Sequence, residues 1–354
     1  MKALHKNILE RLDQIINNTG DHIHDFINNP HAFTRKRTLD AATVLKTTIN
    51  MQGQNLNSEL FRAFGEDATK KNDKVVSTSA YVQRKSQLSP ACFKHILTVF
   101  NQNLFNIQLF DHHYRLFAID GSDFNQIWNP KSNNIVQASS HKKKPYCQIH
   151  VNALYDLLNN TYQDCIFQPK SEMDERKAAV QMLKALNCGP YIVTVDRGYT
   201  SFNMIENCNR LPNCHYIIRT KAGQGGVKEI TTLPDQECDR EISCLVTTSN
   251  YYYITHKASE NIHHVQHYYR QYIKYRSKNT QDLSWDFGEL CTIKFRACKF
   301  RINDAKSGKE EWEVVLTNLD RKNYPLKRIK ELYHLRWGIE TSFKKLKYSL
   351  GSVQ

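Results

Sequence analysis

The sequence contains no long apolar run, and this lack excludes two classes of protein. No stretch approaches the length of about 20 apolar residues that a membrane-spanning helix needs. Residues 1–20 alternate charged and apolar side chains, whereas a signal peptide has an uninterrupted apolar centre. We therefore expect a protein that is neither secreted nor inserted into a membrane.

The cysteines lack a pattern as well. The chain has 10 cysteines, and none of them forms a CxxC pair. Without that pair, zinc ribbons and thioredoxin-like redox sites have no support. His263 and His267 have a spacing that permits metal binding on a helix, but the absence of an HExxH sequence argues against that role. Scattered, reduced thiols are typical of a cytoplasmic protein, which is where we place this chain.

Acidic residues are fewer than basic ones, with 35 Asp and Glu against 49 Lys and Arg and a formal net charge of +14. A basic excess of this size favours a polyanionic partner, most simply nucleic acid. The charge alone also fits a soluble basic protein without such a partner. Hydrophobic residues make up 40% of the chain, which is too many for a disordered protein.

Residues 1–112 are predicted to form a helical N-terminal region that binds DNA. Residues 38–51 and 89–105 carry apolar side chains at intervals of three and four, as amphipathic helices do. Between them, Tyr81, Arg84 and Lys85 lie close together in the sequence and are candidate phosphate contacts. A solvated helix face explains these three residues equally well.

The rest of the chain predicts an α/β fold. Short apolar runs are typical of five strands, at residues 114–120, 148–158, 161–169, 191–196 and 214–221. Helical patterns interrupt them at residues 171–189 and 201–211, so residues 113–221 form the first part of an α/β core. Further β-rich runs make residues 222–320 a mostly β insertion. Residues 321–354 then predict one long helix, with Pro325 near its start and Gly351 past its end.

Two aspartates come at the ends of predicted core strands. Asp120 closes the run "RLFAID" before Gly121, and Asp196 closes "YIVTVD" before "RGY". Acids at strand ends face the crevice where α/β proteins place their sites, although an Asp that only caps a turn gives the same pattern. Asp123 is an alternative to Asp120 as the acid of this strand end. We prefer Asp120 because Asp120 directly ends the apolar run.

The C-terminal helix sets four polar residues on one stripe. Because an α-helix turns about 100° per residue, Tyr333, Arg336, Glu340 and Lys347 fall within roughly 60° of arc. An apolar stripe lies beside them and is predicted to face the core: Leu332, Leu335, Ile339, Phe343 and Leu346. An ordinary surface pair of Arg336 with Glu340 would also explain the spacing.

Glu340 would give the two strand-end aspartates a third carboxylate. Hard oxygen ligands of this kind suit Mg²⁺ or Mn²⁺. Two such ions can hold the attacking and leaving oxygens of a phosphodiester in line, without a covalent nucleophile. The sequence therefore predicts a site at which Asp120, Asp196 and Glu340 bind two divalent ions.

The spacing of Tyr333, Arg336, Glu340 and Lys347 resembles the Y-R-E-K signature of bacterial DDE-class transposases of the insertion-sequence-four family. "AIDGS" and "VDRGY" look like the blocks that hold the first and second catalytic aspartates of that family. The order of these blocks, with a β insertion before Glu340, matches as well. The resemblance covers residues 114–347 in blocks, and a four-position signature alone is moderately specific.

This resemblance implies a ribonuclease-H-like core with Asp120, Asp196 and Glu340 as catalytic and metal-binding residues. It implies a bacterial enzyme at the nucleoid, binding the terminal inverted repeats of an insertion sequence and target DNA as a homodimer. Water and then a DNA 3′-hydroxyl would attack phosphodiesters at the ends of the element. Residues that would contact phosphates are Tyr333, Arg336 and Lys347, and we add Lys344 and Arg197 as neighbours of the site.

Some points stay open from the sequence. Relatives of this kind form a DNA hairpin with a base flipped onto an aromatic residue. Trp285 or Trp312 could serve, although we favour a place in the core for both. Residues 263–276 interleave aromatic and basic side chains and are a candidate DNA contact. The family usually continues well past its lysine, whereas this chain ends at Gln354, so a truncated, non-catalytic remnant is one alternative. A stand-alone two-metal nuclease is another.

Overall fold

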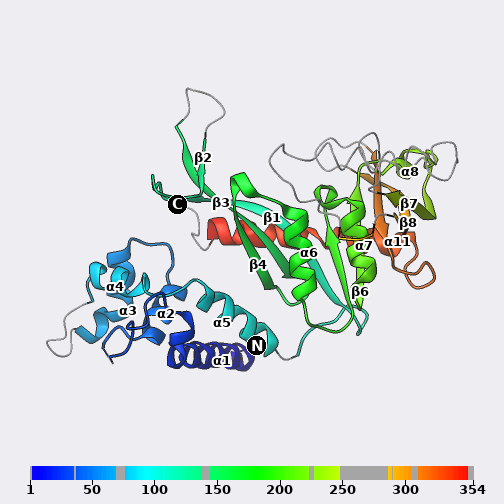
Figure 1. Ribbon diagram of the computed structural model, residues 1–354. Helices are drawn as coiled ribbons and strands as arrows, with labels where there is room; N and C mark the ends of the chain where they lie inside the picture. Colours follow the sequence, from blue (N-terminus) through cyan, green and yellow to red (C-terminus); the bar gives the residue numbers. More distant parts are fainter. Residues whose placement is uncertain are drawn as a thin grey trace. The chain divides into compact units, whose positions relative to one another are not determined.

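The computed structural model describes residues 2–35, 37–68, 76–104, 106–137, 144–222, 227–247, 286–288, 290–303 and 310–349. The chain divides into two compact units, which Figure 1 shows as ribbons. The first comprises residues 1–107, 124–127 and 344–354, and the second comprises residues 108–123 and 128–343. The four-part division predicted from the sequence remains a prediction.

The first unit is helical. Its elements are α1 (Lys2–Asp21), η1 (Ile23–Phe26), α2 (Ala41–Ile49), α3 (Leu56–Ala68), α4 (Thr78–Lys85) and α5 (Ala91–Gln102). The helices expected within residues 38–51 and 89–105 are thus present. Asp40 and Ser77 begin α2 and α4, because each side chain accepts a hydrogen bond from a backbone N–H three residues later. One apolar core joins these helices, with Val44, Leu45 and Cys92 fully buried in it.

Helices α1 and α2 approach closely at Gly20. A Cβ at this position would lie 2.7 Å from the Cβ of Ala42 and 2.8 Å from its backbone nitrogen. We expect Gly20→Ala to destabilise the protein by about 1–3 kcal/mol, because backbone cannot yield as a flexible side chain can. Thermal unfolding measures this loss, and Gly189→Ala is the control, since nothing lies within 4 Å of a Cβ there. A Gly20→Ala variant as stable as the parent, as helix propensity alone would favour, contradicts the packing described.

The second unit is built on one mixed sheet. Its strands are β1 (Arg115–Gln126), β2 (Ile135–Val136), β3 (Tyr146–Asp156), β4 (Thr161–Pro169), β5 (Tyr191–Val195), β6 (Cys214–Thr220), β7 (Cys238–Thr247), β8 (Leu290–Asn303) and β9 (Glu310–Thr317). Their order is β2-β3-β1-β5-β6-β9-β8-β7, and β4 pairs with β3. Strands β1, β5 and β6 run parallel, whereas β3–β4, β6–β9, β8–β9 and β7–β8 are antiparallel. The predicted core strands are confirmed, and the sheet continues into the segment expected as an insertion.

Helices cover both faces of this sheet, as the alternation of buried side chains requires. Phe117, Val193 and Ile218 pack with α6 (Glu175–Ala185) and α7 (Phe202–Arg210) on one face. Their neighbours in the strands, such as Leu116 and Ile192, pack on the other face with α11 (Leu326–His334). Figure 1 shows α6 and α7 along the front of the strands. Short elements complete the unit: η2 (Lys170–Glu172), η3 (Arg197–Tyr199) and α8 (Lys228–Thr231).

The single long helix predicted at the C-terminal end is wrong, because the structure breaks it. Helix α11 follows Pro325 as expected but ends at His334, and α12 (Trp337–Lys344) and a π-helical turn (Lys345–Ser349) follow. At the break the backbone N–H groups of Leu335 and Arg336 donate to carbonyls only three residues earlier. The tighter turn rotates the chain, so Leu335, predicted to be buried, is 43% exposed.

Among the described residues, no helix combines the length and the apolar character that crossing a membrane requires. The aromatic and basic segment 263–276, Trp285 and Gly351 lie outside the described residues. Predictions that concern them stay untested.

Candidate functional site

Asp120 and Asp196 lie side by side on neighbouring strands. The parallel ladder of β1 and β5 ends with the pair Ile119↔Val195, and each aspartate is the next residue of its strand. Neighbouring strands are about 4.8 Å apart, so the two side chains leave the sheet at adjacent positions and on the same face. Asp120 does not end its strand, as the sequence suggested, because β1 continues to Gln126. It marks the end of the parallel pairing instead.

The break between α11 and α12 brings Glu340 to the same face. Arg336 donates from Nη2 to Glu340 Oε1 at 2.8 Å and from Nε to the Tyr333 hydroxyl at 3.2 Å. The Tyr333 hydroxyl in turn donates to Asp196 Oδ1 at 3.4 Å. A chain of polar contacts therefore joins Glu340 to Asp196.

The charges of this group act on one another. Burial raises the pKa of Asp120 to about 6, and the negative charges of Glu340 and Glu175 add to the rise, while Arg336 and the Gly121 N–H oppose it. Burial also raises the pKa of Tyr333. The pKa of Arg336 is raised although burial alone would lower it, because Tyr333, Asp196 and Glu340 favour its charged form. The negatively charged carboxylates of this group therefore lie in a partly buried region around Arg336.

A second polar group lies next to Asp120. His150 on β3 contacts Asp123 Oδ1 through Nδ1 at 2.7 Å, and Lys170 donates to Asp123 Oδ2 at 2.6 Å. The other ring nitrogen, Nε2, lies 3.2 Å from Glu175 Oε1, at the first position of α6. Burial lowers the pKa of His150, but the contacts with Glu175 and Asp123 outweigh burial and raise it. Asp123, the rival of Asp120 in the sequence, is therefore committed to an ion pair.

Arginine and tyrosine side chains surround the aspartates. Arg219 on β6 lies 3.5 Å from Asp196 Oδ1 and 3.2 Å from Glu313 Oε2. Tyr199 is 1% exposed, and its hydroxyl has no hydrogen-bond partner among the described residues. Burial raises its pKa well above the ordinary value, and the charges of Glu175, Asp120 and Asp196 raise it further. The charges of all three acids therefore act on this phenol.

The predicted DNA contacts differ in their accessibility. Arg197 is exposed directly after Asp196, whose carboxylate accepts its backbone N–H at 2.7 Å. Tyr333 and Arg336 are only 4% and 2% exposed. Lys344, which is exposed, and Lys347 belong to the first unit, where Lys347 Nζ lies 4.9 Å from the centre of the Phe124 ring.

The candidate phosphate contacts of the first unit and the candidate stacking residue Trp312 also have contacts within the protein. Arg84 donates to the Leu39 carbonyl, and Tyr81 is buried with its hydroxyl against Thr48, so only Lys85 of that trio is exposed. The ring of Trp312 packs against the cations of Lys299 and Arg301, each 4.7 Å from its centre.

The sequence reasoning missed Glu175, His150, Tyr199 and Arg219. Nothing in the sequence distinguishes Glu175 from an ordinary acid in the first turn of a helix, and no motif distinguishes His150 within its strand. A signal existed for one of them: Tyr199 belongs to the block "VDRGY" that was already assigned to the site. The positions of His150 and Arg219 depend on strand order, which brings β3 and β6 beside β1 and β5. The position of Glu175 depends on the close approach of α6 to Gly121.

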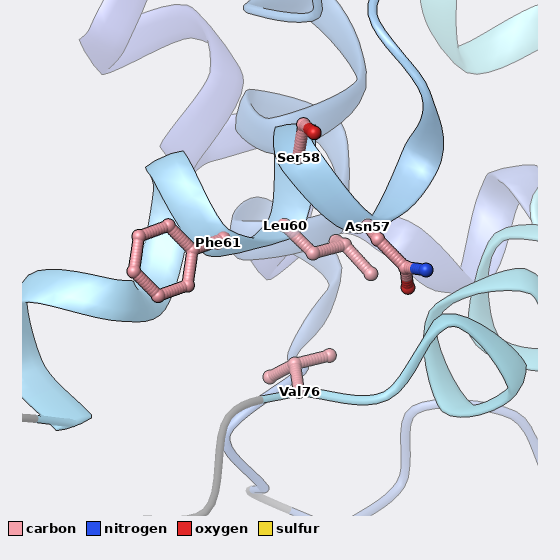
Figure 2. Close-up of a pocket in the computed structure, with 5 residues that line it drawn as sticks. All are labelled: Asn57, Ser58, Leu60, Phe61 and Val76. Carbon is pink, nitrogen blue, oxygen red and sulfur yellow. The ribbon is translucent and has the colours of Figure 1, made fainter.

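A separate hollow of about 420 Å³ lies in the helical unit. Figure 2 shows its lining, with Asn57, Ser58, Leu60 and Phe61 from α3 and Val76 across from them. It carries no acid or base, so it offers no chemistry of its own.

The three predicted acids fit a divalent cation in donor type and in charge. Carboxylate oxygens are the ligands that Mg²⁺ and Mn²⁺ prefer. The pKa of Asp120 is raised mainly by burial and further by the charges of Glu340 and Glu175, and a bound cation would favour the charged form of this carboxylate. As the side chains stand, no group of three or more acid, histidine or cysteine residues in the described part of the chain is close enough to hold an ion.

The pKa of Asp120 predicts a pH dependence of stability. With a value near 6 in the native state against 3.8 unfolded, the native state binds more protons between these values, so stability falls as pH rises through this window. Asp120→Asn removes this cost and is expected to stabilise the metal-free protein by on the order of 2 kcal/mol at pH 7.5 and hardly at all at pH 4. Urea unfolding at both pH values, with exposed Asp235→Asn as the control, measures it. Equal effects at the two pH values would contradict the shift.

Comparisons with known proteins identify a family for the chain. Among solved structures, a piggyBac transposase synaptic complex with hairpin DNA matches with a TM-score of 0.43 and 9% sequence identity, covering 96% of this chain and 66% of that chain. No curated protein matches the chain. A profile of the transposase DDE domain matches residues 111–353, a range that contains Asp120, Asp196 and Glu340. The chain therefore belongs to the transposase DDE domain family.

Proposed function

We propose that this protein is a DNA transposase that cuts and rejoins phosphodiester bonds at the ends of an insertion sequence. One observation carries the proposal: Asp120 and Asp196 leave adjacent parallel strands at the same level, and Arg336 and Tyr333 link Glu340 to them. Membership of the DDE family supports the reaction class. The Y-R-E-K spacing favours the insertion-sequence-four branch of the family.

We extend the proposal to the fold. The order β4-β3-β1-β5-β6, with β1, β5 and β6 parallel, supports a ribonuclease-H-like core. Strands β7, β8 and β9 come between β6 and α11 in the chain and would be the insertion. The catalytic acids would then come from β1, from the end of β5 and from α12.

Asp120, Asp196 and Glu340 would hold two Mg²⁺ or Mn²⁺ ions. When bound, such ions activate the attacking oxygen and stabilise the leaving oxygen. Arg336 orients the Glu340 carboxylate, and Tyr333 holds Arg336 and Asp196 in place. Arg197, exposed beside Asp196, is positioned to contact a phosphate of the DNA strand. The buried Tyr333 and Arg336 would reach DNA only through a change of side-chain position.

The partners proposed are the terminal inverted repeats and the target DNA, bound by a homodimer near the bacterial nucleoid in the cytoplasm. The net charge of +14 supports a polyanionic partner. Exposed Lys85 in the first unit and Arg197 in the second are candidates for backbone contacts.

Incubation of the protein with a duplex that carries the end of its own element tests the function. We expect nicking that requires Mg²⁺ or Mn²⁺, followed by joining of the free 3′-hydroxyl to a target duplex. Nicking without joining would indicate a two-metal nuclease. Binding of the end without nicking in either metal would indicate a non-catalytic DNA-binding protein.

Lys347→Ala is expected to weaken binding to that duplex. Loss of one phosphate contact should lower the slope of log affinity against log salt concentration by about 1, with little effect on sequence preference. Fluorescence anisotropy at several salt concentrations measures the slope. Lys322→Ala removes the same charge from an exposed loop of the other unit and is the control. A slope equal to that of the parent argues against a phosphate contact at Lys347.

A further inference from the structure

We propose that Glu175 is a fourth carboxylate of the catalytic site and contributes to binding of the divalent ions. This inference rests on the proposed function, because the ions are those that Asp120, Asp196 and Glu340 would hold. Nothing in the Y-R-E-K signature or in the two aspartate blocks includes Glu175. The argument comes from its position beside both aspartate-bearing segments.

Two glycines leave room for the Glu175 carboxylate. A Cβ at Gly121, the residue after Asp120, would lie 2.5 Å from Glu175 Oε1. A Cβ at Gly198, two residues after Asp196, would lie 3.7 Å from Glu175 Oε2. The carboxylate therefore reaches the backbone of β1 where a side chain would block it, and it lies between the segments that carry the two aspartates.

The Glu175 carboxylate is not committed elsewhere in the way that Asp123 is. Asp123 has both oxygens in hydrogen bonds, one with His150 and one with Lys170. Glu175 lies 3.2 Å from His150 Nε2, but this buried nitrogen has no partner with hydrogen-bond alignment. His150 therefore keeps the carboxylate near Gly121 without saturating its oxygens.

An unsatisfied hydroxyl points to a missing ligand at this place. Tyr199 is 1% exposed, and its hydroxyl has no partner among the described residues, although leaving such a group unpaired costs about 1–3 kcal/mol. The charges that act on this phenol are, in order, those of Glu175, Asp120 and Asp196. A buried, unpaired donor on which three carboxylate charges act is expected where a hydrated cation completes the site, because water on the ion can accept its hydrogen bond.

Titration of the metal-free, full-length protein with Mn²⁺, followed by the loss of the free-ion electron paramagnetic resonance signal, tests the inference. Glu175→Gln keeps the shape of the side chain and is expected to weaken Mn²⁺ binding about tenfold or more. Glu172→Gln removes an acid from an exposed position three residues earlier and should bind as the parent does. Circular dichroism without metal confirms that each variant is folded.

Glu175→Asp provides a second variant, in which a shorter side chain draws the carboxylate away from Gly121. We expect its affinity to lie between those of the parent and of Glu175→Gln. If both variants bind Mn²⁺ as the parent does while Asp120→Asn does not, the inference about Glu175 is overturned and the proposed function stands. If Asp120→Asn also binds normally, the proposed ion site itself fails.

Discussion

Replacing Glu340 by Gln is expected to lower metal-dependent nicking of an element-end duplex by on the order of 10³-fold, the loss seen when one electrostatic group of a transition state is removed. The Gln side chain still accepts the hydrogen bond that Arg336 donates to Oε1 at 2.8 Å, so the fold and DNA binding should change little. Single-turnover cleavage and a binding titration on the same duplex separate the two effects.

The matched control is Glu331→Gln. Glu331 is an exposed acid on α11, nine residues before Glu340, and its loss removes the same charge without touching the polar chain. Cleavage at the rate of the parent by Glu331→Gln, with cleavage by Glu340→Gln slower by on the order of 10³-fold, would assign the loss to the site. Cleavage by Glu340→Gln at the rate of the parent would remove Glu340 from the catalytic group.

The second large effect is expected at Arg336. Arg336 is 2% exposed and its guanidinium is paired with Glu340, so Arg336→Ala leaves partly buried acids without their partner. Breaking a buried pair in this way costs about 3 kcal/mol, at the lower end of the usual range because Glu340 is partly exposed. Urea unfolding in the absence of divalent ions measures the loss. Arg321→Ala, at a surface ion pair, should change stability by less than about 1 kcal/mol.

Two further measurements separate charge from packing at Arg336. In the Glu340→Gln background, Arg336→Ala should cost less, because part of the charge that it balances is already gone. Addition of Mg²⁺ should restore stability to Arg336→Ala more than to the parent, since a bound cation would take over the same role. An Arg336→Ala variant as stable as Arg321→Ala would contradict the central position of this arginine.

Much of the second unit could be predicted from the sequence, because apolar runs and helix caps are local signals. The strands around Asp120 and Asp196 and the helices that begin at Glu175 and Phe202 were expected near their observed places. Two local details were wrong for physical reasons. Strand β1 continues past Asp120, although its parallel pairing with β5 ends at Ile119, and the C-terminal helix breaks where Arg336 turns inward to Tyr333 and Glu340.

The candidate site could be predicted only in part. Asp120 and Asp196 were found because each closes an apolar run, and Glu340 because of its spacing from Tyr333 and Arg336. His150, Glu175 and Arg219 were not found, since their place in the site depends on strand order and on the absence of a side chain at Gly121. The burial of Tyr333 and Arg336 was not expected either, because a helical wheel cannot show a break in the helix.

The central claim is that Asp120, Asp196 and Glu340 meet around divalent ions. Fe²⁺ in place of Mg²⁺, with ascorbate and peroxide, generates radicals at a bound ion that cut the nearby backbone. Fragment mapping of the full-length protein should show cuts close to residues 120, 196 and 340 together, all suppressed by excess Mg²⁺. Cuts at only one of these places, or cuts that Mg²⁺ does not suppress, would contradict the claim.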